Sequence, residues 1–270
     1  MASISRKYLF GGDKRWSTSD WTACDDRVRG GASISYLAIK SSTTTITNPE
    51  QNQDQPENES NSVLFYGKLD ASTLGGAGFA SHRNKTNTID WNLADYDGIE
   101  LQIGESDGKR YVFIIKDEIL PKRPDGRNRT SVNWEYEFVI PSSETMREGN
   151  VVRLRWKDFR PTYRGRLKDD LKRELNVAGI KRVTIMMRSF FGYQEGGFEL
   201  EIKSIAAFKE EEEDSETTLP AIQDTAGQQE AGIDREAAIV TRAESARSRP
   251  GERQRPGSLL RRLWSACCGY

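Results

Sequence analysis

Residues 21–37, WTACDDRVRGGASISYL, place two adjacent carboxylates and two guanidinium groups next to a pair of glycines. Asp25 and Asp26, with Arg27 and Arg29, have the residue types of an active site in which paired carboxylates act as general acid and base. On a β-strand, however, neighbouring side chains point to opposite faces, so the two carboxylates could not work together. In a turn they could accept backbone N–H groups or pair with the arginines. The segment is therefore either a reacting centre or an ion-paired corner that holds a fold together and meets a partner.

Other residues that could do chemistry are few. His82 is the only histidine, which weakens the case for a nucleophilic triad or a zinc site. We expect it to be a solvated or capping residue in a polar loop. The segment GGAGFAS lacks the third glycine of a dinucleotide fingerprint, and its glycines predict close backbone packing or a bulge. Asp95 and Asp97 could form a calcium corner, but a turn with side-chain hydrogen bonds is favoured. We therefore expect no catalytic, cofactor-binding or metal-binding residue, and an enzyme is the least favoured class.

The totals exclude several classes of function. The chain of 270 residues carries 40 lysines and arginines against 41 acidic residues, a formal net charge of -1, so it lacks the basic field that recruits nucleic acid. Three cysteines, Cys24, Cys267 and Cys268, do not make a disulfide framework and favour a reducing compartment. No run of about 18 apolar residues occurs, so no membrane-spanning helix is predicted.

Alternation of apolar and polar residues recurs along the chain and predicts strands. The clearest runs are residues 98–104, 110–116, 134–140, 151–157, 182–188 and 197–208. We expect the charged positions of the runs 134–140 and 151–157 to lie on solvated faces. Leu167, Leu171 and Leu175 form one stripe and predict a short helix over residues 166–175. Many short strands with one short helix predict an all-β fold, an antiparallel β-sandwich or jelly roll.

Composition divides the chain into a domain and a tail. Hydrophobic residues make up 36% of the chain and the mean hydropathy is -0.72, too low for a chain that is globular throughout. We predict one domain over residues 1–208, with a disordered polar insertion at about 41–62. Residues 209–270 are predicted to be a disordered tail, first acidic and then basic. Its final segment, GSLLRRLWSACCGY, is either frayed or an amphipathic anchor in which Cys267 and Cys268 are candidate lipidation sites.

Several stretches taken together resemble the complex I intermediate-associated protein 30 family, assembly factors for respiratory NADH:ubiquinone oxidoreductase. The matching stretches are SDWTACDDRVRGGASISYL, LFYGKLD, GGAGFAS, WNLADYDGIELQI, FRPTYRGR and IKRVTIMMRSFFGYQEGGFELEIKSIAAF. They cover most of residues 8–208 in the order of the family. The resemblance implies a galactose-binding-like β-sandwich and a non-enzymatic assembly factor or chaperone that binds unassembled protein subunits.

The resemblance also implies a role for the segment at Asp25. The stretch from Asp25 to Gly31 would be a fixed structural corner before a strand, with Gly30 and Gly31 allowing a bulge or a turn with positive φ. Arg27 or Arg29 would neutralise the carboxylates within the molecule or across an interface. The family implies a mitochondrial location; the alternatives are the cytoplasm or the membrane periphery, because no clear presequence is visible.

Two other functions remain open from the sequence. Sandwiches of this type often bind sugars through aromatic side chains in loops, and the candidates here are Trp21, Trp91, Tyr96 and Tyr193. The tail could instead recruit the protein to a membrane surface through Cys267 and Cys268. The client protein is not identified by the sequence.

Overall fold

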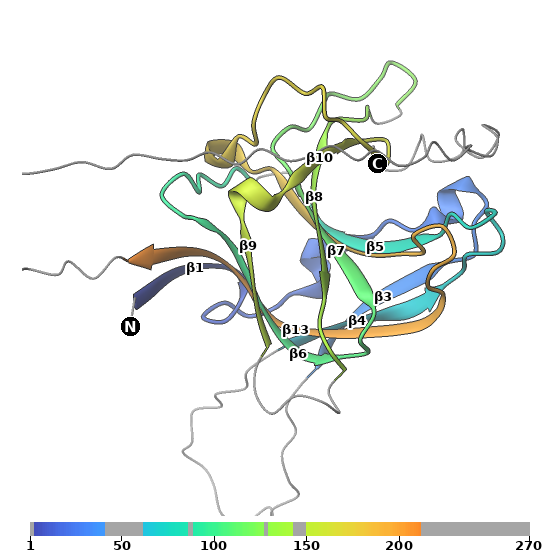
Figure 1. Cartoon of the computed structure of the whole chain (residues 1–270), viewed down its shortest axis with the longest axis horizontal. Coiled ribbons are helices and arrows are strands. Elements are labelled where there is room, and N and C mark those ends of the chain that lie inside the picture. Colours follow the sequence, from blue (N-terminus) through green and yellow to red (C-terminus); the bar gives the residue numbers. More distant parts are fainter. Residues whose placement is uncertain (1–2, 41–61, 86–88, 127–128, 143–149, 212–270) are drawn as a thin grey trace, which may run out of the picture.

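The computed structural model describes residues 3–40, 62–85, 89–126, 129–142 and 150–211, and in this part of the chain two antiparallel sheets face each other (Figure 1). The first sheet contains β1 (Ser3–Gly11), β3 (Ile34–Lys40), β4 (Ser62–Leu69), β6 (Gly98–Ser106), β9 (Asn150–Arg155) and β13 (Gly196–Glu211). The second contains β2 (Trp21–Ala23), β5 (Phe79–Asn84), β7 (Arg110–Lys116), β8 (Asn133–Val139), β10 (Arg160–Tyr163), β11 (Arg166–Leu167) and β12 (Arg182–Arg188). The predicted antiparallel β-sandwich is confirmed.

The order of strands differs from their order in the chain. The first sheet runs β3-β4-β13-β6-β9, with β1 also paired to β13, and the second runs β11-β10-β8-β7-β12-β5-β2. β13 is 16 residues long and shares one edge between two partners: Gly196–Ile202 pair with β4, and Ser204–Glu211 pair with β1. β6 pairs along its other edge. β13 therefore holds the first sheet together.

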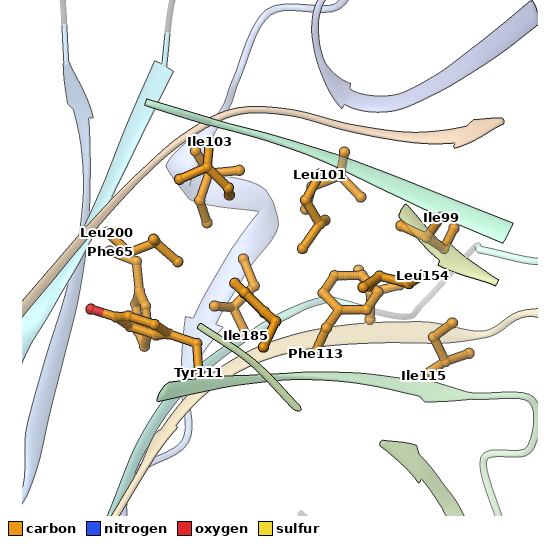
Figure 2. Packing of buried hydrophobic residues seen from close by; sticks show 14 of the residues in the cluster. Phe65, Ile99, Leu101, Ile103, Tyr111, Phe113, Ile115, Leu154, Ile185 and Leu200 are labelled. Carbon is orange, nitrogen blue, oxygen red and sulfur yellow. The ribbon is translucent and has the colours of Figure 1, made fainter. Parts of the chain in front are cut away.

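The main core lies between the sheets and follows from the alternation in the sequence. Alternate residues of β6 point toward alternate residues of β7 (Figure 2): Ile99, Leu101 and Ile103 from β6, and Tyr111, Phe113 and Ile115 from β7. All six side chains are buried. Burying each apolar side chain of this size stabilises the fold by roughly 1.5–3 kcal/mol, so this layer is the main source of cohesion between the sheets.

The second sheet also carries apolar residues on its outer face. Val112 and Ile114 of β7 point away from the main core and form a small cluster with Phe79 and Met186, against which Phe190 packs. This explains why the sequence of β7 is apolar at nearly every position, as in a central strand covered on both sides. The expectation of a solvated outer face is wrong for Glu135 in the same sheet, because its side chain is buried.

The predicted helix over residues 166–175 is wrong. Arg166–Leu167 form β11, a turn follows, and in the described part of the chain the helical elements are 3-10 turns of three or four residues: η1 (Thr18–Asp20), η2 (Asp26–Arg29), η4 (Trp156–Asp158) and η5 (Val177–Gly179). Leu171 and Leu175 still pack against the core. A spacing of four residues is not specific to a helix, because residues i and i+4 also share a face in an extended chain.

Asp117, which directly follows β7, fixes the irregular segment that replaces the helix. Both terminal guanidinium nitrogens of Arg173 donate to its carboxylate, and the backbone N–H of Asn176 donates to Oδ2 at 3.0 Å. The Asp117 side chain is almost fully buried. These tertiary hydrogen bonds stabilise a non-helical path that local sequence preference does not predict.

We expect Asp117→Asn to lower the free energy of unfolding by about 1.5–3 kcal/mol at neutral pH, because it weakens hydrogen bonds to a charged group. Burial opposes ionisation, but the hydrogen bonds from Arg173 and Asn176 outweigh it and lower the pKa of Asp117. As the pH falls, the unfolded chain therefore takes up a proton before the folded one, and the stabilisation is lost below about pH 4. Urea unfolding from neutral pH to about pH 3 should show the deficit of the variant shrinking. A deficit that is constant with pH would contradict this.

Candidate functional site

Asp26 is fully buried and accepts hydrogen bonds from both sheets. Its Oδ1 accepts the backbone N–H of Ser33 at 3.0 Å, and its Oδ2 accepts the Ser33 hydroxyl at 2.6 Å. The same Oδ2 accepts the backbone N–H of Phe79, the first residue of β5, at 3.0 Å. Because Ser33 directly precedes β3, this one carboxylate joins the first sheet to the second.

Asp25 repeats the arrangement two residues further along both strands. Its Oδ1 accepts the Ser35 hydroxyl at 2.6 Å and the backbone N–H of Ser81 at 3.0 Å. Its Oδ2 accepts the backbone N–H of Ser35 at 3.1 Å and Nη2 of Arg27 at 3.3 Å. We call Asp25, Asp26, Ser33 and Ser35 the carboxylate corner. Both acids are buried and their oxygens are engaged as acceptors, so the corner has the form of a structural anchor.

The glycines that follow meet two different requirements. Gly30 adopts φ 82°, the left-handed conformation that ends η2, and its N–H donates to the carbonyl of Arg27 at 3.1 Å. Gly31 is required for lack of space, because a Cβ at this position would lie 2.3 Å from Oδ1 of Asp26. Arg29 stacks its guanidinium over the ring of Phe79, with 5.7 Å from Cζ to the ring centroid. The charged and glycine residues of the predicted motif therefore all take part in the contacts or backbone geometry of this corner.

The corner supports two neighbouring loops. The N–H of Asp70 donates to the Ser33 hydroxyl at 3.0 Å, which ties the start of the 70–78 loop to the same serine that binds Asp26. At the end of that loop, the N–H of Gly78 donates to the hydroxyl of Ser189 at 2.8 Å, and that hydroxyl donates to the carbonyl of Gly76 at 2.6 Å. A Cβ on Gly78 would lie 1.9 Å from the carbonyl of Asp70, so close backbone packing explains this glycine. η2 and the loops 70–78 and 189–195 consequently lie side by side at one end of the sandwich (Figure 1).

The outer face of the second sheet carries a buried ion pair. Nη2 of Arg188 in β12 lies 2.6 Å from Oε2 of Glu135 in β8, reaching across β7, and both side chains are buried. The Thr162 hydroxyl donates to Oε1 of Glu135 at 2.6 Å. The pair borders a groove of about 750 Å³ lined by Glu135, Tyr136, Glu137, Lys157, Asp158, Arg160, Thr162, Gly165, Leu167 and Arg188. The groove combines acidic and basic side chains and could hold a polar ligand or a chain segment.

The structure corrects the interpretation of His82. It lies in β5 and its ring packs edge-on against Phe65, with the ring centroids 6.0 Å apart. It is therefore a buried strand residue and not a solvated loop residue. Burial lowers its pKa, since the charged form is the one that loses solvation.

Three of the four aromatic residues considered for sugar binding are turned inward. Trp21 is buried, and Trp91 and Tyr96 are partly buried and pack against the main core. Tyr193 is exposed. Asp97 accepts the backbone N–H of Glu210 in β13 at 2.8 Å, a bond to a distant strand and not the local turn hydrogen bond that the sequence favours. Among the described residues, no group of three or more His, Cys, Asp or Glu side chains is placed to hold a metal ion.

Some predictions concern parts of the chain that the structure leaves undescribed. Cys267 and Cys268, the polar insertion at about 41–62 apart from Ser62, and most of the tail lie outside the described residues. Within the described ranges, no helix has the length and apolar character needed to cross a membrane.

The sequence analysis did not identify the residues that donate hydrogen bonds to Asp25 and Asp26. Ser33 and Ser35 could have indicated them, because two serines at alternate positions before an apolar run can each donate a hydroxyl and an N–H to one acceptor. The ion pair of Glu135 and Arg188 had no local signal, since 53 residues separate its members. Their burial depends on how β8 and β12 flank β7.

Residues 8–202 match the sequence model of the family described as Complex I intermediate-associated protein 30. The chain belongs to this family. An uncharacterized protein of Schizosaccharomyces pombe is 39% identical over 199 residues, which are 74% of this chain and 82% of that protein. The carboxylate corner and both supported loops lie within the residues that match the family.

Solved structures with a similar arrangement of strands share little sequence with this family member. A family 11 carbohydrate-binding module from the cellulase Lic26A-Cel5E of Clostridium thermocellum superposes with a TM-score of 0.46 and 14% identity, covering 76% of this chain and 95% of the module. An exo-beta-agarase structure superposes with a TM-score of 0.40 and 10% identity, covering 77% of this chain and 26% of the agarase chain.

The two glycines of the corner should respond differently to the same substitution. We expect Gly30→Ala to cost about 1–2 kcal/mol of unfolding free energy, the usual penalty for a left-handed residue with a side chain. Gly31→Ala should cost about 3–5 kcal/mol, because it displaces a buried carboxylate from its hydrogen-bond donors. Urea unfolding of the two variants compares them directly. Equal destabilisation would mean that Asp26 is not held as described.

A double-mutant cycle tests whether Glu135 and Arg188 form one structural unit. Arg188→Met alone should destabilise the protein by about 3–5 kcal/mol, since it leaves Glu135 buried without its cation. Adding Glu135→Gln should recover a large part of that loss, giving a coupling of about 1–3 kcal/mol. Thermal or urea unfolding of the single and double variants measures the coupling. Simple additivity would show that the pair contributes no mutual stabilisation.

Proposed function

We propose that this protein is a non-enzymatic assembly factor that binds unassembled protein subunits during the assembly of respiratory complex I. The observation that carries the proposal is family membership: the match to the Complex I intermediate-associated protein 30 family spans residues 8–202 and so includes nearly the whole sandwich. The name of the family describes association with complex I intermediates, which is a binding role.

The geometry of the carboxylate corner supports a binding role over catalysis. Asp25 and Asp26 are the carboxylates whose spacing first suggested a reacting pair, and each accepts hydrogen bonds from a serine of one sheet and from a backbone N–H of the other. Their protein donors occupy the positions that a substrate or an attacking water would need. The corner therefore orients loops that can contact a partner.

We further propose a mitochondrial location, which the assembly of a respiratory complex requires. Fluorescence imaging of the full-length protein, labelled internally within the polar insertion so that both ends stay free, is the direct measurement. A mitochondrial signal is expected. A signal at the plasma membrane that disappears with Cys267→Ser and Cys268→Ser would instead favour recruitment through the tail.

Deletion of the gene tests the function. We expect native gels of the deletion strain to show less full-size complex I and more of its smaller intermediates, because subunits lack a binding factor before they are joined. Complex IV on the same gel is the control for general mitochondrial damage, and re-expression of the full chain should restore complex I. Normal amounts of complex I in the deletion strain would overturn the proposal.

A further inference from the structure

The loop between β12 and β13, residues 189–195 with the sequence SFFGYQE, holds two consecutive aromatic residues in the left-handed conformation. Phe190 has φ 48° and Phe191 has φ 64°. Bulky residues rarely adopt positive φ, because the Cβ approaches the backbone carbonyl. Such strain persists only where the surrounding structure imposes it, and it is concentrated at functional sites. We call residues 189–195 the aromatic loop.

Hydrogen bonds at both ends impose this conformation. At the start, Ser189 is fixed to the 70–78 loop through its hydroxyl and through its N–H, which donates to the carbonyl of Gly78 at 2.9 Å. At the end, the side-chain amide of Gln194 donates to the carbonyls of Arg110 and Arg188 at 2.8 and 2.7 Å. Its Oε1 accepts the N–H of Arg110 at 3.1 Å. The loop is thereby clamped between two strands and a neighbouring loop.

In this fixed conformation, one aromatic ring of the loop packs against the protein and two are exposed to solvent. Phe190 packs onto the small apolar cluster on the outer face of the second sheet, and the guanidinium groups of Arg110 and Arg188 stack on its ring with Cζ 4.9 and 5.3 Å from the centroid. Phe191 is 67% exposed and Tyr193 is 91% exposed. An exposed pair of aromatic side chains on a rigid backbone is typical of the residues that dominate the free energy of protein–protein binding.

The basic side chains beside the aromatic loop are paired within the molecule, and the one charged residue of the loop itself, Glu195, is exposed at its end. Arg110 lies 3.7 Å from Glu137, Lys109 lies 3.2 Å from Asp107, and Arg188 pairs with Glu135. A charged partner would have to compete with these pairs, whereas an uncharged apolar partner would not. Val139, which pairs with Arg110 across β7 and β8 and is 53% exposed, adds an apolar side chain to the sheet face on which Arg110 stacks with Phe190.

We infer that the aromatic loop is a docking surface for an extended, apolar and uncharged segment of a protein subunit that is not yet buried in its complex. This inference rests on the proposed function and specifies the surface and the partner chemistry for it. Phe191 and Tyr193 would bury their rings against apolar side chains of the segment. The strained backbone keeps both rings in place before binding, so less conformational entropy is lost when the segment docks.

An array of synthetic 15-residue peptides provides the probe. It contains apolar uncharged, acidic and basic sequences, and tiled segments of the complex I subunits. The full-length protein is compared with Phe191→Asn and Tyr193→Ser. Asparagine tolerates positive φ, so Phe191→Asn removes the ring without adding strain, and its melting temperature should be unchanged or higher. Tyr36→Ser is the matched control, because Tyr36 is an exposed aromatic residue of β3 that lies outside the aromatic loop.

We expect the protein to bind apolar uncharged peptides, each loop variant to weaken that binding at least about tenfold, and Tyr36→Ser to leave it unchanged. Preference for charged peptides, no binding to any peptide, or binding that survives both loop variants would overturn the inference. Binding to phosphatidylcholine vesicles but not to peptides would identify a lipid surface and overturn it as well. If complex I is lost on deletion while the array fails, the proposed function stands and only this surface is rejected.

Discussion

The structure depends on two carboxylates that take the place of missing strand partners. β2 pairs with β5 only as far as Ala23, and β3 is the outermost strand of the first sheet. The part of β5 from Phe79 to Ser81, which lies beyond its pairing with β2, and the outer edge of β3 would therefore present backbone N–H groups without a ladder partner at this end. Asp25 and Asp26 accept those groups, one from each strand per side chain. A single pair of neighbouring residues thus closes two sheet edges and fixes the separation of the sheets.

At this end of the sandwich, a corner whose hydrogen-bond acceptors are all occupied lies next to a loop with a strained backbone. The carboxylate corner is buried and its acceptors are filled, whereas the aromatic loop that it helps to position keeps unfavourable backbone angles and exposes two large rings. The connection between them is short, running from Ser33 through the 70–78 loop to Ser189. Such a division is expected where a rigid scaffold holds a recognition loop, because the scaffold must offset the strain of the loop.

The sequence predicted the parts of the fold that depend on local pattern. Alternation identified the strands that contribute to the main core, and the double-sided apolar pattern of residues 110–116 identified β7 as a central strand. The helix over residues 166–175 is not formed because Asp117 binds Arg173 and Asn176, which lie 56 and 59 residues later in the chain, and holds the segment on another path. The predictions for Glu135 and His82 failed for a related reason. A polar residue suggests a solvated position when only its own segment is considered, but Glu135 finds a buried partner in Arg188 of the same sheet, and His82 packs against Phe65 of the facing sheet. Pairings across sheets are set by topology, which the pattern of one segment does not contain.

The place of β13 in the sheet constrains the order in which the molecule can form. It is the last described strand of the chain, yet it pairs with β1, β4 and β6, so the first strand meets its neighbour only after some 200 residues have been synthesised. During translation the early strands must wait with open edges, which are the surfaces most prone to mispairing. Closure of the first sheet is a late, non-local event, and folds dominated by such contacts form slowly. A nascent chain of this kind would itself benefit from protection on the ribosome.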